Sequence, residues 1–390
     1  MISVPAWVLL AAAVFGLYTY LGYPLLLSLL ALVRRRRTLA APLAEWPTVT
    51  IVLPVHNEEA VVRDTLENLL GLDYPEDRRR ILVLSDASTD RTDAIVRGYT
   101  HRGVQLMRLP QRAGKTAAEN AALPLLASEI IVNTDASVRV ERAALKRLIT
   151  RFADPSIGVA SSHNVSVATL EGEGGARANA GEAWYVGYDM WVRDLESRVS
   201  GIVGAAGCLY AVRAPIQMQR LPAALARDFA AALLAREHGL RAVSVRDAIC
   251  FVPRIPSLRR EYWRKVRTIT RGFETLYDRR RLLNPLRYGL FSWILASHKL
   301  CRWLSPHVGV AALVAAAFLA VRVPWSRWGL GLVACAGGCA ALAWWWPERW
   351  RLPKLLALPA YVVVGNLAAL HASLRALRGA HSPIWEPTRR

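Results

Sequence analysis

Apolar residues gather in long runs at the two ends of the chain. Residues 7–33 contain no charged side chain, and about 20 apolar residues suffice to cross a bilayer as a helix. Four arginines, Arg34–Arg37, follow directly, and such a basic flank favours the cytoplasmic side. A cleaved signal peptide would have a shorter apolar region preceded by positive charge. The pattern therefore predicts a retained membrane anchor with a basic flank over residues 1–47.

The C-terminal region repeats this pattern and is expected to hold the remaining spans. Apolar runs occupy residues 307–320, 329–346 and 355–370, and tryptophans lie at several of their ends, as in interfacial belts. Residues 290–304 mix charged and apolar positions and are interpreted as an amphipathic helix on the membrane surface. We expect about four spans in the whole chain, three of them within residues 286–390. The arginines of the tail favour the cytoplasmic side, which leaves the side of the C-terminus open.

Between these ends, the pattern changes to short apolar runs that alternate with amphipathic segments. The runs at residues 48–54, 80–85, 104–109 and 129–134 are typical of buried strands. Helical periodicity lies between them, at residues 58–70, 92–98 and 115–127. Alternation of this kind predicts an α/β domain with a mostly parallel sheet. Ligands of such sheets bind beyond the carboxyl ends of the strands.

Polar residues follow each of these strands directly. They are the segments PVHNE at 54–58, SDASTD at 85–90, Gly114–Lys115, and TDAS at 134–137. In a parallel sheet these ends meet at one edge, although each acid alone is more often a turn cap. The Gly114-Lys115-Thr116 sequence has the ending of a phosphate-binding GxxxxGK[ST] loop, but Leu109 stands where that loop needs its first glycine. A P-loop nucleotide hydrolase is therefore excluded.

Composition and charge narrow the classes of partner. The chain has 390 residues, is 53% hydrophobic, and carries 50 Lys and Arg against 30 Asp and Glu, a net charge of +20. The hydrophobic content excludes a mainly disordered chain. Five cysteines without a CxxC pair argue against a disulfide scaffold or a zinc ribbon. The arginines lie beside the apolar runs and no nucleic-acid-binding motif occurs, so membrane lipids and nucleotide phosphate are expected partners, and nucleic acid polymers are not.

Taken together, the motifs resemble those of family-2 glycosyltransferases. The resemblance rests on the strand-end segments above, on Asn120, on GAAGCLYAVR at 204–213 and on ARDF at 226–229. It is strongest for the membrane-integrated branch with cellulose-, chitin- and hyaluronan-synthase-like enzymes. It implies a GT-A-like nucleotide-sugar-binding domain over about residues 48–285, with transmembrane helices on either side.

The resemblance also implies roles for individual residues. Asp228 matches the catalytic base, Asp86 the carboxylate that reads the uracil imide, and Lys115 a basic residue near the diphosphate. Asp135 matches the first acid of the DxD element that holds the metal–diphosphate, and Gly207 lies on the acceptor side. The full set expected to bind the donor is Pro54, Val55, Glu58, Asp86, Ser88, Lys115 and Asp135. The implied cofactor is a divalent metal, Mg²⁺ or Mn²⁺.

Three positions depart from the family pattern. The second DxD acid is replaced by Ser137, a weak metal ligand, and the acid usual before the catalytic Asp is replaced by Arg227. The processive QxxRW motif keeps only its arginine, Arg271. Together with Arg267, it is expected to clamp the diphosphate; an interfacial basic helix is the equal alternative.

These expectations combine into one hypothesis. The chain is predicted to be an inverting glycosyltransferase, multi-pass in the plasma (inner) membrane with a cytoplasmic catalytic domain. It would move a sugar from a nucleotide sugar, expected to be UDP-linked, to a lipid-linked or cell-surface saccharide acceptor. Ser137 and Arg227 motivate the alternative of a catalytically decayed membrane scaffold or nucleotide-sugar-binding protein. A transporter is disfavoured because no apolar run holds an isolated acid.

Overall fold

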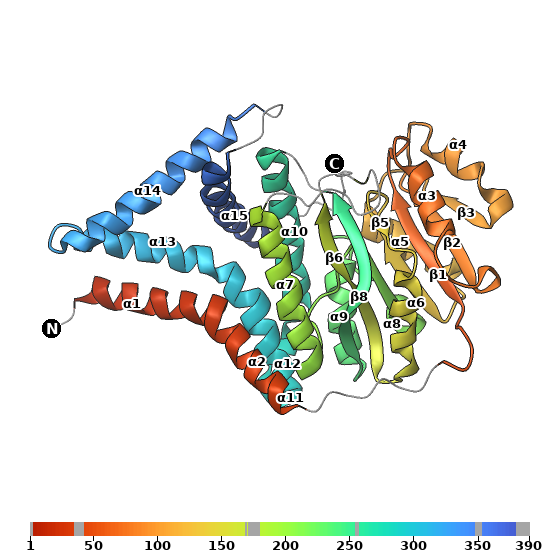
Figure 1. Cartoon of the computed structure of the whole chain (residues 1–390), viewed down its shortest axis with the longest axis horizontal. Helices are drawn as coiled ribbons and strands as arrows, with labels where there is room; N and C mark the ends of the chain where they lie inside the picture. Colours follow the sequence, from red (N-terminus) through yellow and green to blue (C-terminus); the bar gives the residue numbers. More distant parts are fainter. Residues whose placement is uncertain are drawn as a thin grey trace. The chain divides into compact units, whose positions relative to one another are not determined.

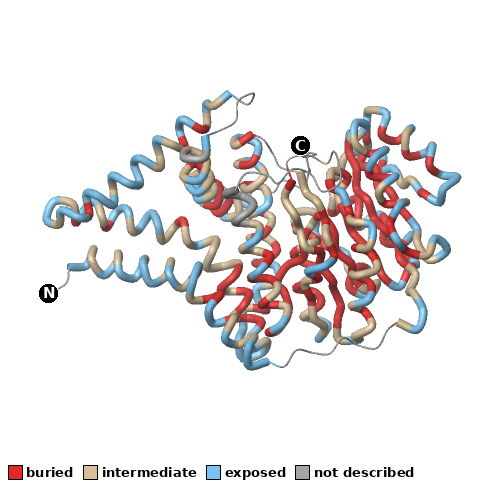
Figure 2. Tube along the Cα trace, in the orientation of Figure 1, coloured by how far each residue is buried: buried red, intermediate tan, exposed pale blue. Residues whose placement is uncertain are grey.

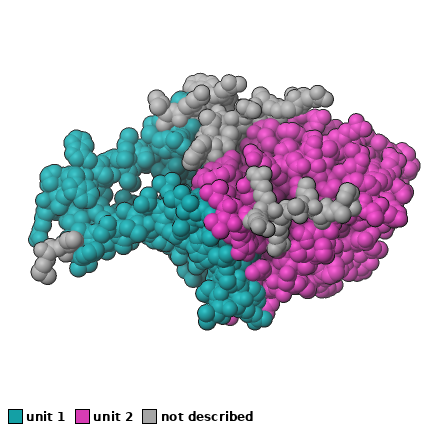
Figure 3. Space-filling model, turned by 60° about the horizontal axis from the view of Figure 1, so that its bottom comes forward, with its two compact units in different colours: residues 1–30, 255–273, 283–380 teal, residues 31–254, 274–282, 381–390 magenta. Residues whose placement is uncertain are grey.

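The computed structural model describes residues 3–34, 43–167, 170, 180–253, 257–347 and 353–379, so Arg35–Arg37 and the final residues of the tail lie outside the description. The chain divides into two compact units, coloured separately in Figure 3. The helical unit comprises Met1–Leu30, Ile255–Phe273 and Leu283–Ala380. The sheet unit comprises Ala31–Arg254, Glu274–Leu282 and His381–Arg390.

The sheet unit is built on eight strands in the order β3-β2-β1-β4-β7-β6-β8-β5 (Figure 1). The strands are β1 (Val49–Val55), β2 (Arg79–Ser85), β3 (Val104–Arg108), β4 (Ile130–Thr134), β5 (Arg139–Val140), β6 (Ile157–Val167), β7 (Leu209–Arg213) and β8 (Arg241–Pro253). Strands β1 to β4 pair in parallel, as do β6 and β8. Strand β7 runs antiparallel to both of its neighbours, and β5 runs antiparallel to β8. The expected mostly parallel α/β sheet is therefore confirmed for the first four strands, and the sheet as a whole is mixed.

Helices cover both faces of this sheet, and the strands are buried between them (Figure 2). Their bounds are α3 (Val62–Leu70), α4 (Thr92–Arg97), α5 (Lys115–Ala122), α6 (Ala144–Ile149), α7 (Ala180–Val199), α8 (Ala214–Gln217) and α9 (Arg227–Glu237). Ile51 and Leu53 of β1 pack in one cluster with α3 and α6, whereas Val52 packs with α5 on the opposite face. Successive strand residues point to opposite faces. A strand with both faces covered therefore reads as a continuous apolar run.

Two turns at the ends of β1 and β2 adopt left-handed backbone. Asn57 and Ala87 both have φ of 53°. Asparagine tolerates this region, but an L-residue such as alanine pays about 1–2 kcal/mol for it. Both turns belong to the strand-end segments identified in the sequence, so local backbone strain coincides with the candidate chemistry.

The helical unit contains the apolar helices. Its elements are α1 (Val4–Leu17), a π-turn at Tyr18–Gly22, α2 (Tyr23–Val33, ending in the sheet unit), α11 (Pro285–Tyr288), α12 (Leu290–Leu295), a π-turn at Ala296–Cys301, α13 (Arg302–Leu319), α14 (Pro324–Trp344) and α15 (Lys354–Leu377). Among the described residues, four helices are long and apolar enough to cross a membrane: Val4–Val33, Leu290–Leu319, Pro324–Trp344 and Leu356–Leu377. This finding agrees with the expected transmembrane helices at both ends of the chain.

The amphipathic stretch expected over residues 290–304 is part of a longer helical segment. Leu290–Leu319 runs without interruption as a single candidate span. Tyr18 lies 2.7 Å from the Ser297 hydroxyl and accepts a 2.8 Å hydrogen bond from the Trp293 indole, and His298 is buried. A location of residues 290–304 on the membrane surface stays a prediction.

Helix α10 (Leu258–Asp278) carries the arginines that follow the catalytic motif, and its segment through Phe273 belongs to the helical unit. Tyr262 packs against a small apolar cluster of α14 and α15 and bonds His371 at 2.9 Å. A Cβ at Gly272 would lie 2.7 Å from the Trp303 ring. A side chain at this position would displace the Trp303 ring, so glycine lets the ring lie close to α10. One face of α10 is thus packed within the helical unit.

The strained turn at Ala87 gives a stability prediction. Replacement of Ala87 by glycine removes the left-handed penalty, which exceeds the entropy cost of glycine, and should raise the free energy of unfolding by about 0.5 kcal/mol. Ala94→Gly, in the exposed middle of α4, should lower it by about 1 kcal/mol. Denaturant titration of both variants in detergent checks the opposite signs. A loss of stability in Ala87→Gly would contradict the positive φ.

Candidate active site

The candidate site lies at the edge of the sheet where β1, β2 and β4 end. These strands are parallel, with Val55 paired to Ser85 in the last rung of β1 and β2. The polar segments that follow them therefore meet at a common edge. Pro54 and Val55 are buried within β1, and the Val55 carbonyl accepts the Asp86 amide at 2.9 Å. These two residues place the site through their backbone.

Asp86 holds the start of α5. Its two carboxylate oxygens accept the backbone amides of Ala113 and Gly114 at 2.7 and 2.9 Å, and the residue is 1% exposed. Gly114 has φ of 92°, which favours glycine, and is the N-cap residue directly before α5. A buried carboxylate paired with two amides is a strong, charge-assisted contact. The assignment of Asp86 as a reader of uracil stays a prediction.

Lys115 and Asp135 form an ion pair beside this contact. The Lys115 ammonium lies 2.7 Å from Asp135 Oδ1, and their side chains are 18% and 27% exposed. Burial lowers the pKa of Lys115, but the carboxylates of Asp135, Glu119 and Asp228 outweigh it and hold this pKa above its ordinary value. The ammonium is therefore charged throughout the neutral range. Lys115 thus provides a fixed positive charge at this edge, and such a charge can face a ligand's negative charge.

The turns that follow β1 and β2 are joined by hydrogen bonds to side chains. The Asn57 amide donates to Ser88 Oγ at 3.2 Å, and the Glu58 amide donates to Thr92 Oγ1 at 2.8 Å. Asp90 accepts the amides of Glu59 and Thr92 at 3.0 and 2.9 Å. Ser88 and Glu58 therefore lie at the predicted edge, and Asp90 shapes the turn.

Asp228 stands in the first turn of α9. Its Oδ1 accepts the Phe229 amide at 2.9 Å, and its main-chain carbonyl accepts the Ala205 amide at 3.1 Å. A Cβ on Gly207 would lie 2.6 Å from Asp228 Oδ2. The segment carrying Gly207 therefore passes directly beside the carboxylate, and a larger side chain there would push the carboxylate away. Thr116, which follows Lys115, donates to the Leu225 carbonyl at 2.9 Å, three residues before Asp228. The base predicted from the sequence therefore lies on a segment that contacts the helix carrying the donor-side lysine.

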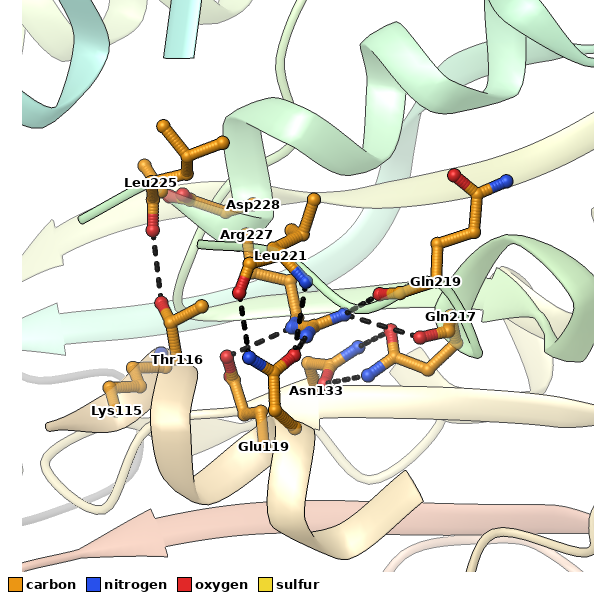
Figure 4. A network of polar contacts seen from close by, with 12 residues as sticks. Lys115, Thr116, Glu119, Asn133, Gln217, Gln219, Leu221, Leu225, Arg227 and Asp228 are labelled. Carbon is orange, nitrogen blue, oxygen red and sulfur yellow. Dashed lines mark hydrogen bonds and ion pairs between the residues drawn. The ribbon is translucent and has the colours of Figure 1, made fainter. Parts of the chain in front are cut away.

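Arg227 departs from the family pattern, and its side chain points away from Asp228. It extends from α9 toward Glu119 on α5, as Figure 4 shows. Glu119 was not identified in the sequence. Its position four residues after Lys115, on the same helical face, was the available signal.

The metal ligands expected from the sequence are sparse. Among the described residues, no cluster of three or more His, Cys, Asp or Glu side chains is arranged to hold a metal ion. Asp135 has one oxygen on Lys115, and Ser137 follows it by two residues. Mg²⁺ is commonly held by one or two carboxylates together with substrate phosphates. The residues present fit a cation that depends on the diphosphate for most of its ligands. Arg267 and Arg271 lie on α10 in the helical unit, and their role as a clamp stays a prediction.

Comparison with known families decides how this arrangement is interpreted. Residues 50–178 match the model described as Glycosyl transferase family 2. The chain contains a family-2 glycosyltransferase domain. The matched segment covers β1 to β6 and the donor-side residues Asp86, Lys115 and Asp135. Asp228 lies beyond it, so its role rests on the local geometry and on the sequence motif.

Curated relatives are similar over parts of this glycosyltransferase domain. A β-monoglucosyldiacylglycerol synthase from Synechocystis is 34% identical over 117 residues, which cover 29% of this chain and 24% of that protein. A protein of the same name from Nostoc is 28% identical over 163 residues, covering 40% and 33%. The matches thus span about a quarter to a third of the length of these relatives.

A solved structure is similar over nearly the whole chain. It is a mannosyltransferase from Pyrobaculum calidifontis in complex with GDP-Man and Mn²⁺, with a TM-score of 0.69 and 23% identity. The alignment covers 95% of this chain and 99% of that one. At this identity the likeness shows the fold. The glycosyltransferase domain has the GT-A fold, as the sequence predicted.

The contact between Gly207 and Asp228 gives a prediction for the site. Gly207→Ala would place a methyl carbon 2.6 Å from Asp228 Oδ2, so the carboxylate would have to move. Turnover of the glycosyltransferase should fall by roughly 10- to 100-fold, since a 1 Å misplacement is costly in catalysis. Gly187→Ala, in α7 with nothing within 4 Å of its Cβ, is the matched control and should keep turnover. Steady-state assays of both variants check this. Full turnover in Gly207→Ala would remove Asp228 from the reacting centre.

Proposed function

We propose that this protein is a membrane-bound inverting glycosyltransferase that transfers a sugar from a UDP-linked donor to a lipid-linked or cell-surface saccharide acceptor. One observation carries the proposal: the Lys115–Asp135 ion pair lies at a strand-end edge of a family-2 glycosyltransferase domain, and the helix that begins with Lys115 contacts the segment leading to Asp228. A cation, a carboxylate suited to a metal–diphosphate and a carboxylate beside Gly207 form the set that this transfer needs.

In the proposed step, Asp228 acts as general base. Its carboxylate takes the proton from the acceptor hydroxyl as the acceptor oxygen forms a bond to the anomeric carbon. The bond from that carbon to the diphosphate oxygen breaks, and its electron pair leaves with the nucleoside diphosphate. A positioned base of this kind contributes about 10²- to 10⁴-fold to the rate. A single carboxylate suffices because attack from the opposite face inverts the anomeric centre in one displacement.

The donor side supplies charge and position. Lys115 is held as a permanent cation where the leaving diphosphate would gather negative charge, so it stabilises the transition state more than the ground state. Asp86 fixes the backbone that precedes Lys115 and thereby its location. A bound divalent metal would neutralise charge on the diphosphate, and Asp135 with Ser137 would hold it.

The acceptor class follows from the membrane helices and from the relatives. Four candidate spans belong to the chain that carries the domain, and the curated relatives are named for synthesis on a diacylglycerol lipid. We propose a plasma (inner) membrane location with the catalytic domain in the cytoplasm, where nucleotide sugars are made. A lipid-linked acceptor would be presented to the enzyme from the bilayer itself.

Asp228→Asn tests the assignment of the base. Asparagine keeps the size of the side chain but cannot take a proton, so transfer from a panel of nucleotide sugars in purified membranes should fall at least 100-fold. The dissociation constant for UDP, measured by calorimetry, should stay within about threefold. The exposed Asp247, which pairs with Arg151 at 3.2 Å, supplies the control Asp247→Asn with normal transfer.

The outcomes of this experiment separate the alternatives. Full turnover in Asp228→Asn would refute the base. A wild-type protein that binds no UDP in the presence of Mn²⁺ and transfers no sugar would favour the catalytically decayed scaffold.

Metal dependence is tested at Ser137. Chelation should abolish transfer and added Mn²⁺ should restore it. Ser137→Asp adds a second acid and should lower the Mn²⁺ concentration for half-maximal activity roughly tenfold, which corresponds to about 1.4 kcal/mol. Ser137→Ala, in which no side-chain oxygen remains, should raise that concentration or leave it unchanged. Transfer that persists in excess chelator would contradict the metal.

A further inference from the structure

The departure at Arg227 has a partner in the structure. Arg227 and Glu119 form an ion pair with Nε 3.1 Å from Oε2, and their side chains are 3% and 0% exposed. An unpaired charge at this depth would be strongly destabilising. Arg227 stands where the family usually has an acid, and its charge is compensated by this buried ion pair with Glu119.

The rest of the Arg227 guanidinium is also engaged. It donates to Asn120 Oδ1 at 2.6 Å and to the carbonyls of Gln217 and Gln219 at 3.2 and 3.4 Å. Asn120 in turn donates to the Leu221 carbonyl at 2.7 Å and accepts the Leu221 amide at 3.2 Å. One side chain thus ties the start of α9 to α5 and to the segment between α8 and α9. A planar guanidinium offers donors in several fixed directions, which lysine cannot do.

A second contact joins the same two parts of the chain. Thr116 Oγ1 donates to the Leu225 carbonyl at 2.9 Å, as Figure 4 shows. Thr116, Glu119 and Asn120 are spaced by three and four residues and lie on one face of α5. This face of α5 bonds the segment that leads to Asp228. Lys115, the first residue of the same helix, pairs with Asp135.

The position of Asp228 depends on these contacts between α5 and the start of α9. Its own contacts, to the Phe229 and Ala205 amides, are with its immediate neighbour and with the adjoining loop. Consecutive helix residues point about 100° apart. Fixing Arg227 toward α5 therefore fixes the rotation at which Asp228 leaves α9, on the side of Gly207.

Resting on the proposed function, we propose that Arg227 and Glu119 are positioning residues that set the Asp228 carboxylate relative to the donor-side lysine through helix α5. Neither residue touches the donor or the acceptor in this role. The pair acts on the proton-transfer step and leaves the binding of the nucleotide to Lys115 and its neighbours.

The decisive experiment compares single and double variants in membranes. Arg227→Met should lower kcat roughly 10- to 100-fold, with the donor KM within about threefold, and should also lower the melting temperature because Glu119 loses its partner. The double variant Glu119→Met with Arg227→Met removes both charges and should regain most of the melting temperature. Its kcat should stay low, because the ties to Asn120 and to the 217–221 segment are gone.

Two further variants keep the test decisive if Arg227→Met does not fold. Arg227→Lys keeps the charge without the guanidinium fork and should show an intermediate kcat. Arg279→Met breaks an ion pair with Glu237 at the far end of α9, 2.9 Å long, and should lower the melting temperature while kcat stays normal.

The results that would overturn the inference are distinct from failure of the proposed function. Recovery of kcat together with melting temperature in the double variant, or a normal kcat in Arg227→Met or Arg227→Lys, would make the pair merely structural. An equal loss of kcat in Arg279→Met would show that any weakening of α9 has the same effect. A wild-type protein inactive toward every nucleotide sugar would instead refute the glycosyltransferase proposal itself.

Discussion

The grip of the buried Asp86 carboxylate on the two amides that begin α5 is the contact on which the candidate site depends. It joins the end of β2 to the first turn of a helix on the sheet face and fixes the residue that follows, Lys115. Lys115 in turn forms an ion pair with Asp135. Another side chain of α5, Glu119, forms an ion pair with Arg227 at the start of α9. A short helix thus connects groups brought from four separate parts of the chain. Burial makes each of these polar contacts costly to break.

The sequence was informative where one rule decided the structure. The first four strands and their helices were predicted because an apolar strand buried on both faces is a continuous run, and each ended in a recognisable polar segment. The shared edge followed from the parallel pairing. Asp86, Lys115 and Asp135 were singled out for this reason, whereas Asp228 was assigned through the family resemblance.

The pairing of strands that are distant in sequence could not be predicted from local hydrophobic patterns. Strand β6 contains serine, histidine and asparagine among its apolar residues, and β8 contains serine, arginine and aspartate, so their partners are decided by topology. The antiparallel direction of β7 could not be predicted from its local sequence. Glu119 appeared as an ordinary helical residue, because its importance comes from Arg227, more than a hundred positions away. The contacts of Trp293 and Ser297 with Tyr18 were invisible in the local pattern for a related reason, since the two parts of the chain are far apart in sequence.

The reversal of direction at β7 has a consequence for how the candidate site is assembled. Strand β4 ends at Thr134 and β7 begins opposite it, at Leu209, with the Thr134 hydroxyl bonded to the Cys208 carbonyl at 2.8 Å. The chain therefore leaves this edge after Asp86, Lys115 and Asp135 and returns to it with a second segment that carries Gly207 and Asp228. The two segments meet where Thr116 and Glu119 of α5 contact Leu225 and Arg227. A substitution on either side of that meeting point is therefore felt by the other side.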